Sequence, residues 1–120
     1  MSAPRVVLVT HPVKGAGAFA GRLVEERLAA CVNLVPIDSV YRWQGRVERA
    51  RELLLVLKTS AARLPQIERF LEREHPYDVP ECVALDPARV EARYGAWLLR
   101  EVSPLSVRRK TTRPSKRGGR

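Results

Sequence analysis

Few side chains of this chain can bind a transition metal: the histidines His11 and His75 and the cysteines Cys31 and Cys82. Copper sites favour imidazole and thiolate donors, because both are softer than carboxylate or water and bind late first-row ions tightly. The two cysteines stand half the chain apart and lack the close spacing of a zinc or redox motif, so we expect each to be a small, reduced, buried residue. The histidines are therefore the candidate metal ligands.

Catalytic motifs are not evident in the sequence. No nucleophile stands beside a base, and no pair of carboxylates has a catalytic spacing. Gly15-Ala16-Gly17 follows an expected strand, but the dinucleotide-binding pattern needs a further glycine where this chain has Ala20. An acylphosphatase-like hydrolase would need an arginine in the same loop, which has Lys14 only. We therefore expect a protein that is not an enzyme.

The net charge of +9 is concentrated at the end of the chain. Residues 1–102 hold 15 Lys or Arg and all 13 Asp or Glu, whereas residues 103–120 hold seven Lys or Arg and no acidic residue. The tail has almost no apolar side chains, so it cannot bury enough surface to offset its ordering entropy. We expect one domain at 1–102 and a disordered tail at 103–120 that contacts polyanions nonspecifically, with a steep salt dependence.

No segment of the sequence indicates export or insertion into a membrane. Arg5–Thr10 is a short apolar run without a cleavage-type segment after it, and no apolar stretch approaches the ~20 residues that cross a bilayer. We therefore expect a cytoplasmic protein that does not contact a membrane.

The apolar pattern predicts the element order β-α-β-β-α-β and one further helix. The expected elements are a strand at Arg5–Thr10, a helix over residues 15–29, strands at Cys31–Trp43 and Gly45–Thr59, a helix around Ile67, a strand at Val79–Leu85 and a helix from Asp86-Pro87. Gln44-Gly45 is a two-residue hairpin signal, and Pro36 indicates a bulge or an edge strand. This order is that of an α+β, ferredoxin-like fold, with an antiparallel sheet and two helices on one face.

The run Leu53-Leu54-Leu55-Val56-Leu57 predicts that both faces of the sheet are covered. An antiparallel strand with one wet face should alternate apolar and polar residues, and this strand does not. Leaving Leu53, Leu55 and Leu57 in water would forgo roughly 1.5–3 kcal/mol each. We expect the last helix and another copy of the chain to cover the second face, and Leu55→Asp to abolish that assembly.

Five strings together resemble the CutA family of divalent-cation tolerance proteins, in its order and spacing. They are Leu28–Asn33, Ser39–Gly45, Glu52–Thr59, His75–Glu81, and Tyr94 with Trp97-Leu98. The resemblance spans about residues 6–98 and implies a ferredoxin-like protomer that closes a homotrimer by pairing its long strands with those of its neighbours. It also implies a role in the response to divalent metals and tolerance of them, copper in particular.

The resemblance further implies a copper site with a cysteine late in the first strand and two adjacent histidines before Pro-Tyr. These positions hold Val9, Glu74 and His75, so only His75 matches. If the first strand continues, His11 points to the same face as the missing cysteine, and Glu74 can add an oxygen donor. Alternatively, His75 anchors the turn before Pro76 by hydrogen bonds and His11 is a loop residue. We expect no required cofactor and at most a weak site for copper or another divalent cation.

A set of mainly polar residues is expected to converge in a cleft between subunits. These residues are Asn33, Trp43, Glu52, Lys58, Tyr77 and Glu81. Such a cleft suits a small ligand. Alternatively, the buried polar groups bond to one another and set the strand register, with Lys58 and Glu81 as the preferred pair.

Two other functions fit the same fold. A trimeric small-molecule sensor or signalling scaffold of nitrogen-regulatory architecture needs a long mobile loop between the middle strands, where this chain has the tight turn Gln44-Gly45. An RNA-binding module exposes aromatic residues on its central strands, where this chain has leucines, and would rely on the basic tail. Tyr41 and Trp43 are interpreted as packing residues near the hairpin.

Overall fold

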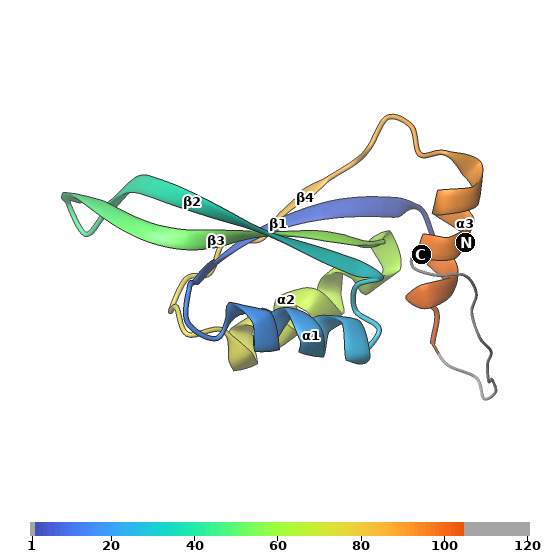
Figure 1. Ribbon diagram of the computed structural model, residues 1–120, viewed down its shortest axis with the longest axis horizontal. Coiled ribbons are helices and arrows are strands. Elements are labelled where there is room, and N and C mark those ends of the chain that lie inside the picture. The colour runs from blue at the N-terminus through green and yellow to red at the C-terminus, as the bar shows by residue number, and fades with distance from the viewer. Residues whose placement is uncertain (1, 105–120) are drawn as a thin grey trace.

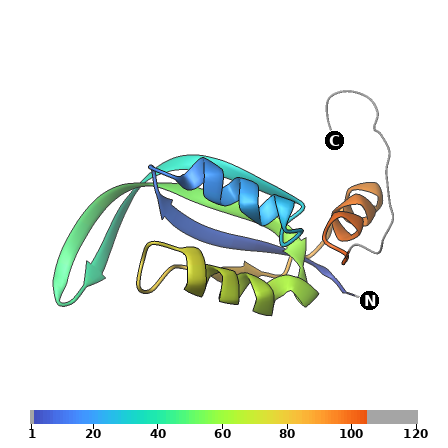
Figure 2. The ribbon, with the colours of Figure 1, turned by 90° about the horizontal axis from the view of Figure 1, so that it is seen from below.

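The computed structural model describes residues 2–104. Its elements are β1 (Pro4–Pro12), α1 (Ala16–Glu25), β2 (Cys31–Trp43), β3 (Arg46–Ser60), the short 3-10 helix η1 (Ala61–Arg63), α2 (Leu64–Glu74), β4 (Val83–Leu85) and α3 (Ala92–Glu101). The strands form one antiparallel sheet in the order β2-β3-β1-β4, and α1 and α2 lie on the same face of it (Figure 1, Figure 2). The expected α+β, ferredoxin-like plan with an additional C-terminal helix is confirmed.

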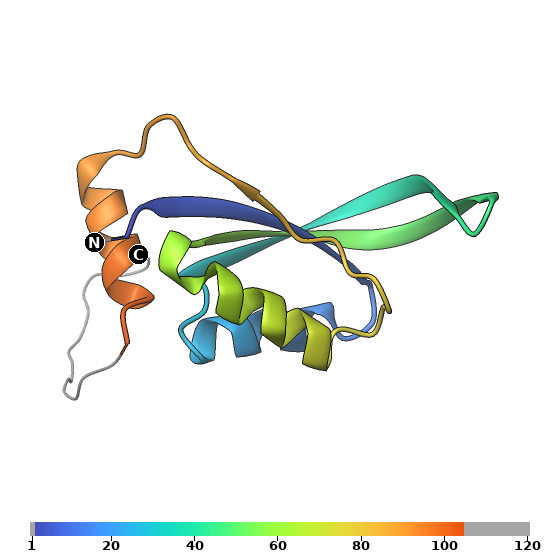
Figure 3. The same ribbon diagram turned by 180° about the vertical axis from the view of Figure 1, so that it is seen from behind.

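The β2–β3 hairpin extends well beyond the two helices (Figure 1, Figure 3). Its turn residues both have positive φ, 51° at Gln44 and 80° at Gly45, as the twist of a two-residue hairpin turn requires. Pro36 lies on β2, an edge strand, and its pairing with Leu53 does not interrupt the register. The edge position predicted from Pro36 is therefore confirmed, and the pairing of β2 with β3 continues past Pro36 without a bulge.

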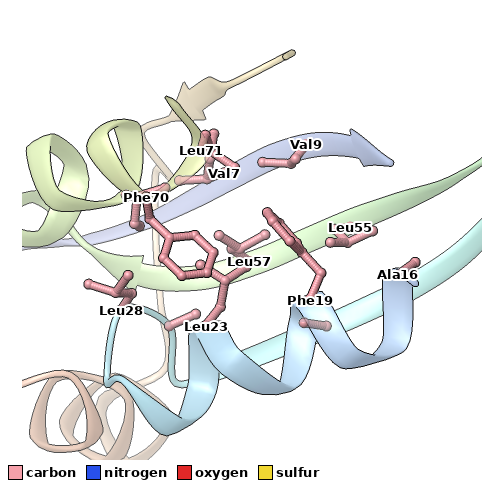
Figure 4. Packing of buried hydrophobic residues seen from close by; sticks show 13 residues of the cluster. Val7, Val9, Ala16, Phe19, Leu23, Leu28, Leu55, Leu57, Phe70 and Leu71 are labelled. Atoms are coloured by element: carbon pink, nitrogen blue, oxygen red, sulfur yellow. The ribbon is translucent and has the colours of Figure 1, made fainter. Parts of the chain in front are cut away.

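The core lies between the inner face of the sheet and the two helices. Val7 and Val9 of β1 pair with Leu57 and Leu55 of β3, and all four side chains are fully buried. The helices cover these strands with the buried side chains Phe19, Leu23, Phe70 and Leu71 (Figure 4). The amphipathic stripes of α1 and α2 therefore bury their apolar side against one face of the sheet only.

The leucine run of β3 is divided between the two faces of the sheet. Leu55 and Leu57 are fully buried beneath the helices, and Leu53 packs against the same core. Leu54 and Val56 alternate with them and therefore lie on the opposite, outer face. The expectation that Leu53, Leu55 and Leu57 need a further cover is wrong, because alternation tells which residues share a face but not which face the helices occupy. Leu55→Asp would disrupt the core of the protomer itself.

α3 lies at one end of the sheet, beside the start of β1 and the end of β3, and leaves the outer face open (Figure 1, Figure 3). The helix begins at Ala92, later than the expected start at Asp86-Pro87. Glu91 is its N-cap, because the Glu91 carboxylate accepts a hydrogen bond from the backbone N–H of Tyr94 at 2.9 Å. The expectation that this helix covers part of the second face is therefore wrong.

β4 is shorter than the expected Val79–Leu85 and comprises Val83–Leu85. It pairs with β1 only from Val6 to Leu8. Farther along β1, the carbonyl oxygen of Thr10 accepts a hydrogen bond from Nε2 of His75 at 2.8 Å. The His75 side chain thus takes the place of a strand as the hydrogen-bond partner of this part of β1. Pro80, which lies in the part of the expected strand that is not formed, has no backbone N–H to donate to β1.

The first helix is shorter than the sequence pattern indicates. α1 ends at Glu25 instead of continuing to residue 29, and Arg27 follows with a positive φ of 60°. Residues 105–120, which make up most of the tail expected to be disordered, lie outside the described residues. Within residues 2–104, the helices are too short and too polar to cross a bilayer.

Candidate functional site

A polar cluster lies where the end of β1 meets the loop after α2, and His75 is at its centre. Nε2 of His75 donates a hydrogen bond to the carbonyl oxygen of Thr10 at 2.8 Å. Nδ1 accepts a hydrogen bond from the backbone N–H of Tyr77 at 3.0 Å. Both ring nitrogens are therefore engaged, and the two bonds together require a neutral ring with its proton on Nε2. This geometry is that of a turn anchor.

The environment of His75 favours the same neutral form. The residue is 8% exposed, and burial lowers the pKa of the imidazole below its ordinary value. The hydrogen bond to Thr10 and the negative charge of Glu52 raise this pKa, while the neighbouring His11 lowers it further. Burial is the largest of these causes, since removing a charged ring from water is unfavourable.

His11 lies on β1, which extends to Pro12, so its side chain shares the inner face with Val9. The residue is 4% exposed, and its ring centroid lies 5.0 Å from that of His75 and 4.7 Å from that of Phe19. Nδ1 of His11 bonds to the carbonyl oxygen of Pro12 at 2.7 Å and must carry the proton. Nε2 of His11 forms no hydrogen bond with the described residues.

Glu74 is engaged by arginines and does not complete a metal site. Its Oε1 accepts a hydrogen bond from Arg22 of α1 at 2.9 Å, and its Oε2 lies 3.6 Å from Nε of Arg73. The Arg22 guanidinium lowers the pKa of the Glu74 carboxyl. Among residues 2–104, no group of three or more His, Cys, Asp or Glu is arranged to hold a metal ion. The donors therefore do not fit a copper site closed within one chain.

Glu52 and Tyr77 form the second part of the cluster. Glu52 is 4% exposed, and its Oε2 accepts a hydrogen bond from the Tyr77 hydroxyl at 2.6 Å. Burial and this bond raise the pKa of Tyr77 well above its usual value. Burial and the charge of Glu52 also raise the pKa of the Glu81 carboxyl. The loop after α2 is thus tied to β3 by a buried carboxylate and a phenol.

Lys58 belongs to a separate polar group nearer the other end of β3. Its Nζ donates to Oδ1 of Asn33 and lies 3.9 Å from Sγ of Cys31. Lys58 and Glu52 are separated by roughly 20 Å of extended strand, and the charge of Glu52 acts on Glu81. The expected ion pair Lys58–Glu81 is not formed among the described residues: the charge of Glu52 acts on Glu81, and Lys58 lies nearer the other end of β3.

Trp43 lies at the far end of the hairpin, paired with Arg46 and 43% exposed. The structure therefore brings Glu52, Tyr77 and Glu81 together, brings Lys58 and Asn33 together, and leaves Trp43 apart. By register, Asn33, Trp43, Glu52 and Lys58 all alternate onto the outer face of the sheet. Sequence patterns did not indicate Thr10, because it contributes a backbone carbonyl, or Arg22, because its partner is distant in sequence.

The outer face is apolar between these polar groups. The half-buried side chains in its centre are Val6, Leu8, Leu54 and Val56. Toward its edges, Val35, Val83 and Leu85 are 41%, 46% and 44% exposed. Within residues 2–104, no helix covers this face (Figure 1).

A family model described as the CutA1 divalent ion tolerance protein matches residues 5–101 of this chain. The divalent-cation tolerance protein CutA of Thermus thermophilus is 50% identical over 95 residues, which are 78% of this chain and 92% of that protein. The chloroplastic protein CutA 1 of Oryza sativa is 45% identical over 95 residues, which are 78% of this chain and 54% of that protein. The family match thus runs from β1 to the end of α3.

Solved structures agree with these sequence similarities. The divalent cation tolerance protein of Thermus thermophilus has a TM-score of 0.80 and 46% identity, covering 83% of this chain and 99% of that one. The CutA of Archaeoglobus fulgidus, described as periplasmic, has a TM-score of 0.80 and 30% identity over 83% of this chain and 99% of that one. A CutA of a Nostoc species, described as PII-like, has a TM-score of 0.79 and 30% identity over 82% and 97%.

Proposed function

Since this chain belongs to the CutA1 divalent ion tolerance family, we propose that it acts in the tolerance of divalent metal ions, copper included, as a homotrimer. The observation that supports the trimer is the open, apolar outer face of the sheet, with Val83 and Leu85 close to half exposed. An apolar face of this kind is unfavourable in water and is typical of an interface between copies of a chain.

Full burial of one Val or Leu contributes about 1.5–3 kcal/mol, so a half-exposed side chain forgoes roughly 1 kcal/mol. Several such side chains on each protomer would add to the stability of an assembly that buries them. The long hairpin, which extends beyond its own helices, supplies further strand surface for a neighbour (Figure 3).

Light scattering on the full chain tests the assembly. We expect three times the chain mass of 13.5 kDa at micromolar concentration. Val56→Asp places a charge at the centre of the outer face and should dissociate the trimer, whereas Val13→Asp, in an exposed loop where the side chain is 53% exposed, should not. A natural chain that is monomeric at micromolar concentration would contradict the proposal.

The metal contact in this proposal is weak and centred on Nε2 of His11. Both nitrogens of His75 are engaged and Glu74 is paired with Arg22, so neither offers a free donor. One imidazole should prefer Cu(II) to Zn(II), following the usual order of divalent ions.

Calorimetric titration of chelator-treated protein with Cu(II), Zn(II) and Cu(I) tests this contact. His11→Ala should abolish the Cu(II) signal, and His75→Ala should weaken it only indirectly. Stoichiometric, submicromolar Cu(II) binding that survives both substitutions would refute the assignment, and Cys31 and Cys82 would be the next candidates.

A second candidate function is a trimeric small-molecule sensor. It is favoured by the polar groups Glu52–Tyr77 and Lys58–Asn33, which border the open face, and by the similarity to the PII-like protein of Nostoc. A ligand in the resulting cleft between subunits would raise the melting temperature of the natural trimer but not that of Lys58→Met. Uniform shifts in both proteins would refute a site at this cleft.

The cytoplasm is the compartment that we propose for this chain. Cys31 and Cys82 are both free, which suits a reducing environment. Cell fractionation with an antibody against the chain tests the assignment. Recovery in a periplasmic fraction, the compartment in the description of the Archaeoglobus fulgidus protein, would contradict it.

A further inference from the structure

A cavity of about 590 Å³ lies where the end of β3, the start of α2 and the end of α3 meet. Its volume is within the range of small-molecule sites. Two arginines, Arg63 and Arg69, line it, and in the part of the chain that the structure describes no carboxylate does. The wall also contains the apolar side chains Leu99 and Val102. The cavity is thus positive on one side and apolar on the other.

The positive charge beside the cavity is not balanced by a neighbour. Arg63, Arg69 and the nearby Arg27 form no ion pair with a carboxylate within residues 2–104. Burial and, after it, repulsion by Arg27 lower the pKa of Arg63. A group of cations that repel one another in a partly buried place is stabilised by an anion.

The Arg63 guanidinium is held in place with one amino group to spare. Its Nε donates to the carbonyl oxygen of Val102 at 2.7 Å, and its Nη1 donates to Oε1 of Gln66 at 2.7 Å. Nη2 forms no hydrogen bond with the described residues. A fixed guanidinium loses little side-chain entropy when it binds an oxyanion.

Ser60 supplies an independent indication of a ligand. It lines the same cavity and is 3% exposed, yet its hydroxyl forms no hydrogen bond with the described residues. A buried hydroxyl without a partner is unfavourable, and a ligand oxygen would satisfy it. The first backbone N–H groups of η1 are already engaged by Ala3 and Ser2, so side chains carry the recognition.

We propose that this cavity binds a small phosphate ester. Arg63 and Arg69 contact the phosphate oxygens, Ser60 donates to a third oxygen, and the organic part of the ester lies against Leu99 and Val102. Guanidinium groups match the oxygen geometry of phosphate and form charge-assisted hydrogen bonds to it. The cavity is too large for the anion alone, since a phosphate group fills only a small part of its volume. This site is separate from His11, which does not line the cavity.

Calorimetric titration of the full chain with phenyl phosphate and with inorganic phosphate, at constant ionic strength, tests the proposal. We expect saturable binding of phenyl phosphate and weaker binding of inorganic phosphate. Arg69→Gln should weaken phenyl phosphate binding about tenfold, as expected for one charge-assisted hydrogen bond. Arg89→Gln removes another exposed arginine away from this cavity and should change the affinity less than about twofold.

Ser60→Ala separates the site from nonspecific attraction by the basic tail, because the substitution changes no charge. It should weaken phenyl phosphate binding about fivefold and leave the melting temperature of the free protein unchanged or higher. Equal effects of Arg69→Gln and Arg89→Gln, or no saturation with either probe, would overturn the site. Equal affinity for the two probes would overturn the assignment to an ester.

Discussion

Replacing Tyr77 with phenylalanine tests whether the loop after α2 is held to the sheet by one hydrogen bond. The Tyr77 hydroxyl donates to Oε2 of Glu52 at 2.6 Å, and Glu52 is 4% exposed. Hydrogen bonds to charged groups contribute about 1.5–3 kcal/mol. Tyr77 is only half-buried, so water can replace part of the bond, and we expect Tyr77→Phe to cost about 1–2 kcal/mol of unfolding free energy.

The assay is chemical and thermal unfolding at one fixed protein concentration, because assembly makes the melting temperature depend on concentration. Tyr41→Phe is the matched control: this tyrosine is 44% exposed and forms no hydrogen bond with the described residues. It should change stability by less than about 0.5 kcal/mol.

The pH dependence gives a second readout of the same bond. The pKa of Tyr77 is raised in the folded protein, so the unfolded chain ionises first as the pH rises. The contribution of Tyr77 to the free energy of unfolding is therefore complete below the ordinary tyrosine pKa of ~10 and is lost as the pH rises above it. Tyr77→Phe should reduce this alkaline loss. The reasoning would be refuted if Tyr77→Phe and the natural chain had the same free energy of unfolding at neutral pH and lost the same amount of it at alkaline pH.

Three further perturbations follow from the fold and the site. Burial lowers the pKa of His75 in the folded protein, so its contribution to stability is complete above the unfolded pKa of ~6.5 and is lost as the pH falls below that value. His75→Gln should therefore reduce the loss of melting temperature at acidic pH. An unchanged loss at acidic pH would contradict this expectation. Gly15 has a φ of 84°, so Gly15→Ala should cost about 1 kcal/mol, whereas Gly17→Ala, inside α1 with open space around its Cβ, should be neutral or stabilising in denaturant titrations. A chain that ends at Pro104 should keep the melting temperature and the assembly but lose retention on heparin at low salt; early unfolding would show that residues 105–120 are structural.

Much of the architecture follows from local patterns in the sequence. The apolar stripes of α1 and α2, the β-branched start of the chain and the turn at Gln44-Gly45 each reflect a periodicity or a backbone preference within a few residues. Pro36 indicated an edge strand because it cannot donate a ladder hydrogen bond. The element order and the antiparallel sheet were predictable for these reasons.

The extent of the elements depended on partners that are far apart in sequence. β4 begins only at Val83, beyond the part of β1 where Nε2 of His75 bonds to the carbonyl oxygen of Thr10, and α3 begins only where Glu91 caps it. Local pattern alone cannot show such substitutions, because a side chain and a strand can satisfy the same carbonyl equally well.

The candidate site also combines features that the sequence indicates with features that only long-range contacts decide. Residue types in the sequence identified His11, His75 and Glu74 as possible ligands, but only the tertiary structure shows that Arg22 engages Glu74 and that two backbone groups engage His75. The choice of sheet face for the leucines of β3 was likewise decided by where α1 and α2 pack. Period-two alternation is symmetric between the two faces, and a polar side chain bonds to whatever group the fold brings within reach, so these outcomes depend on long-range packing.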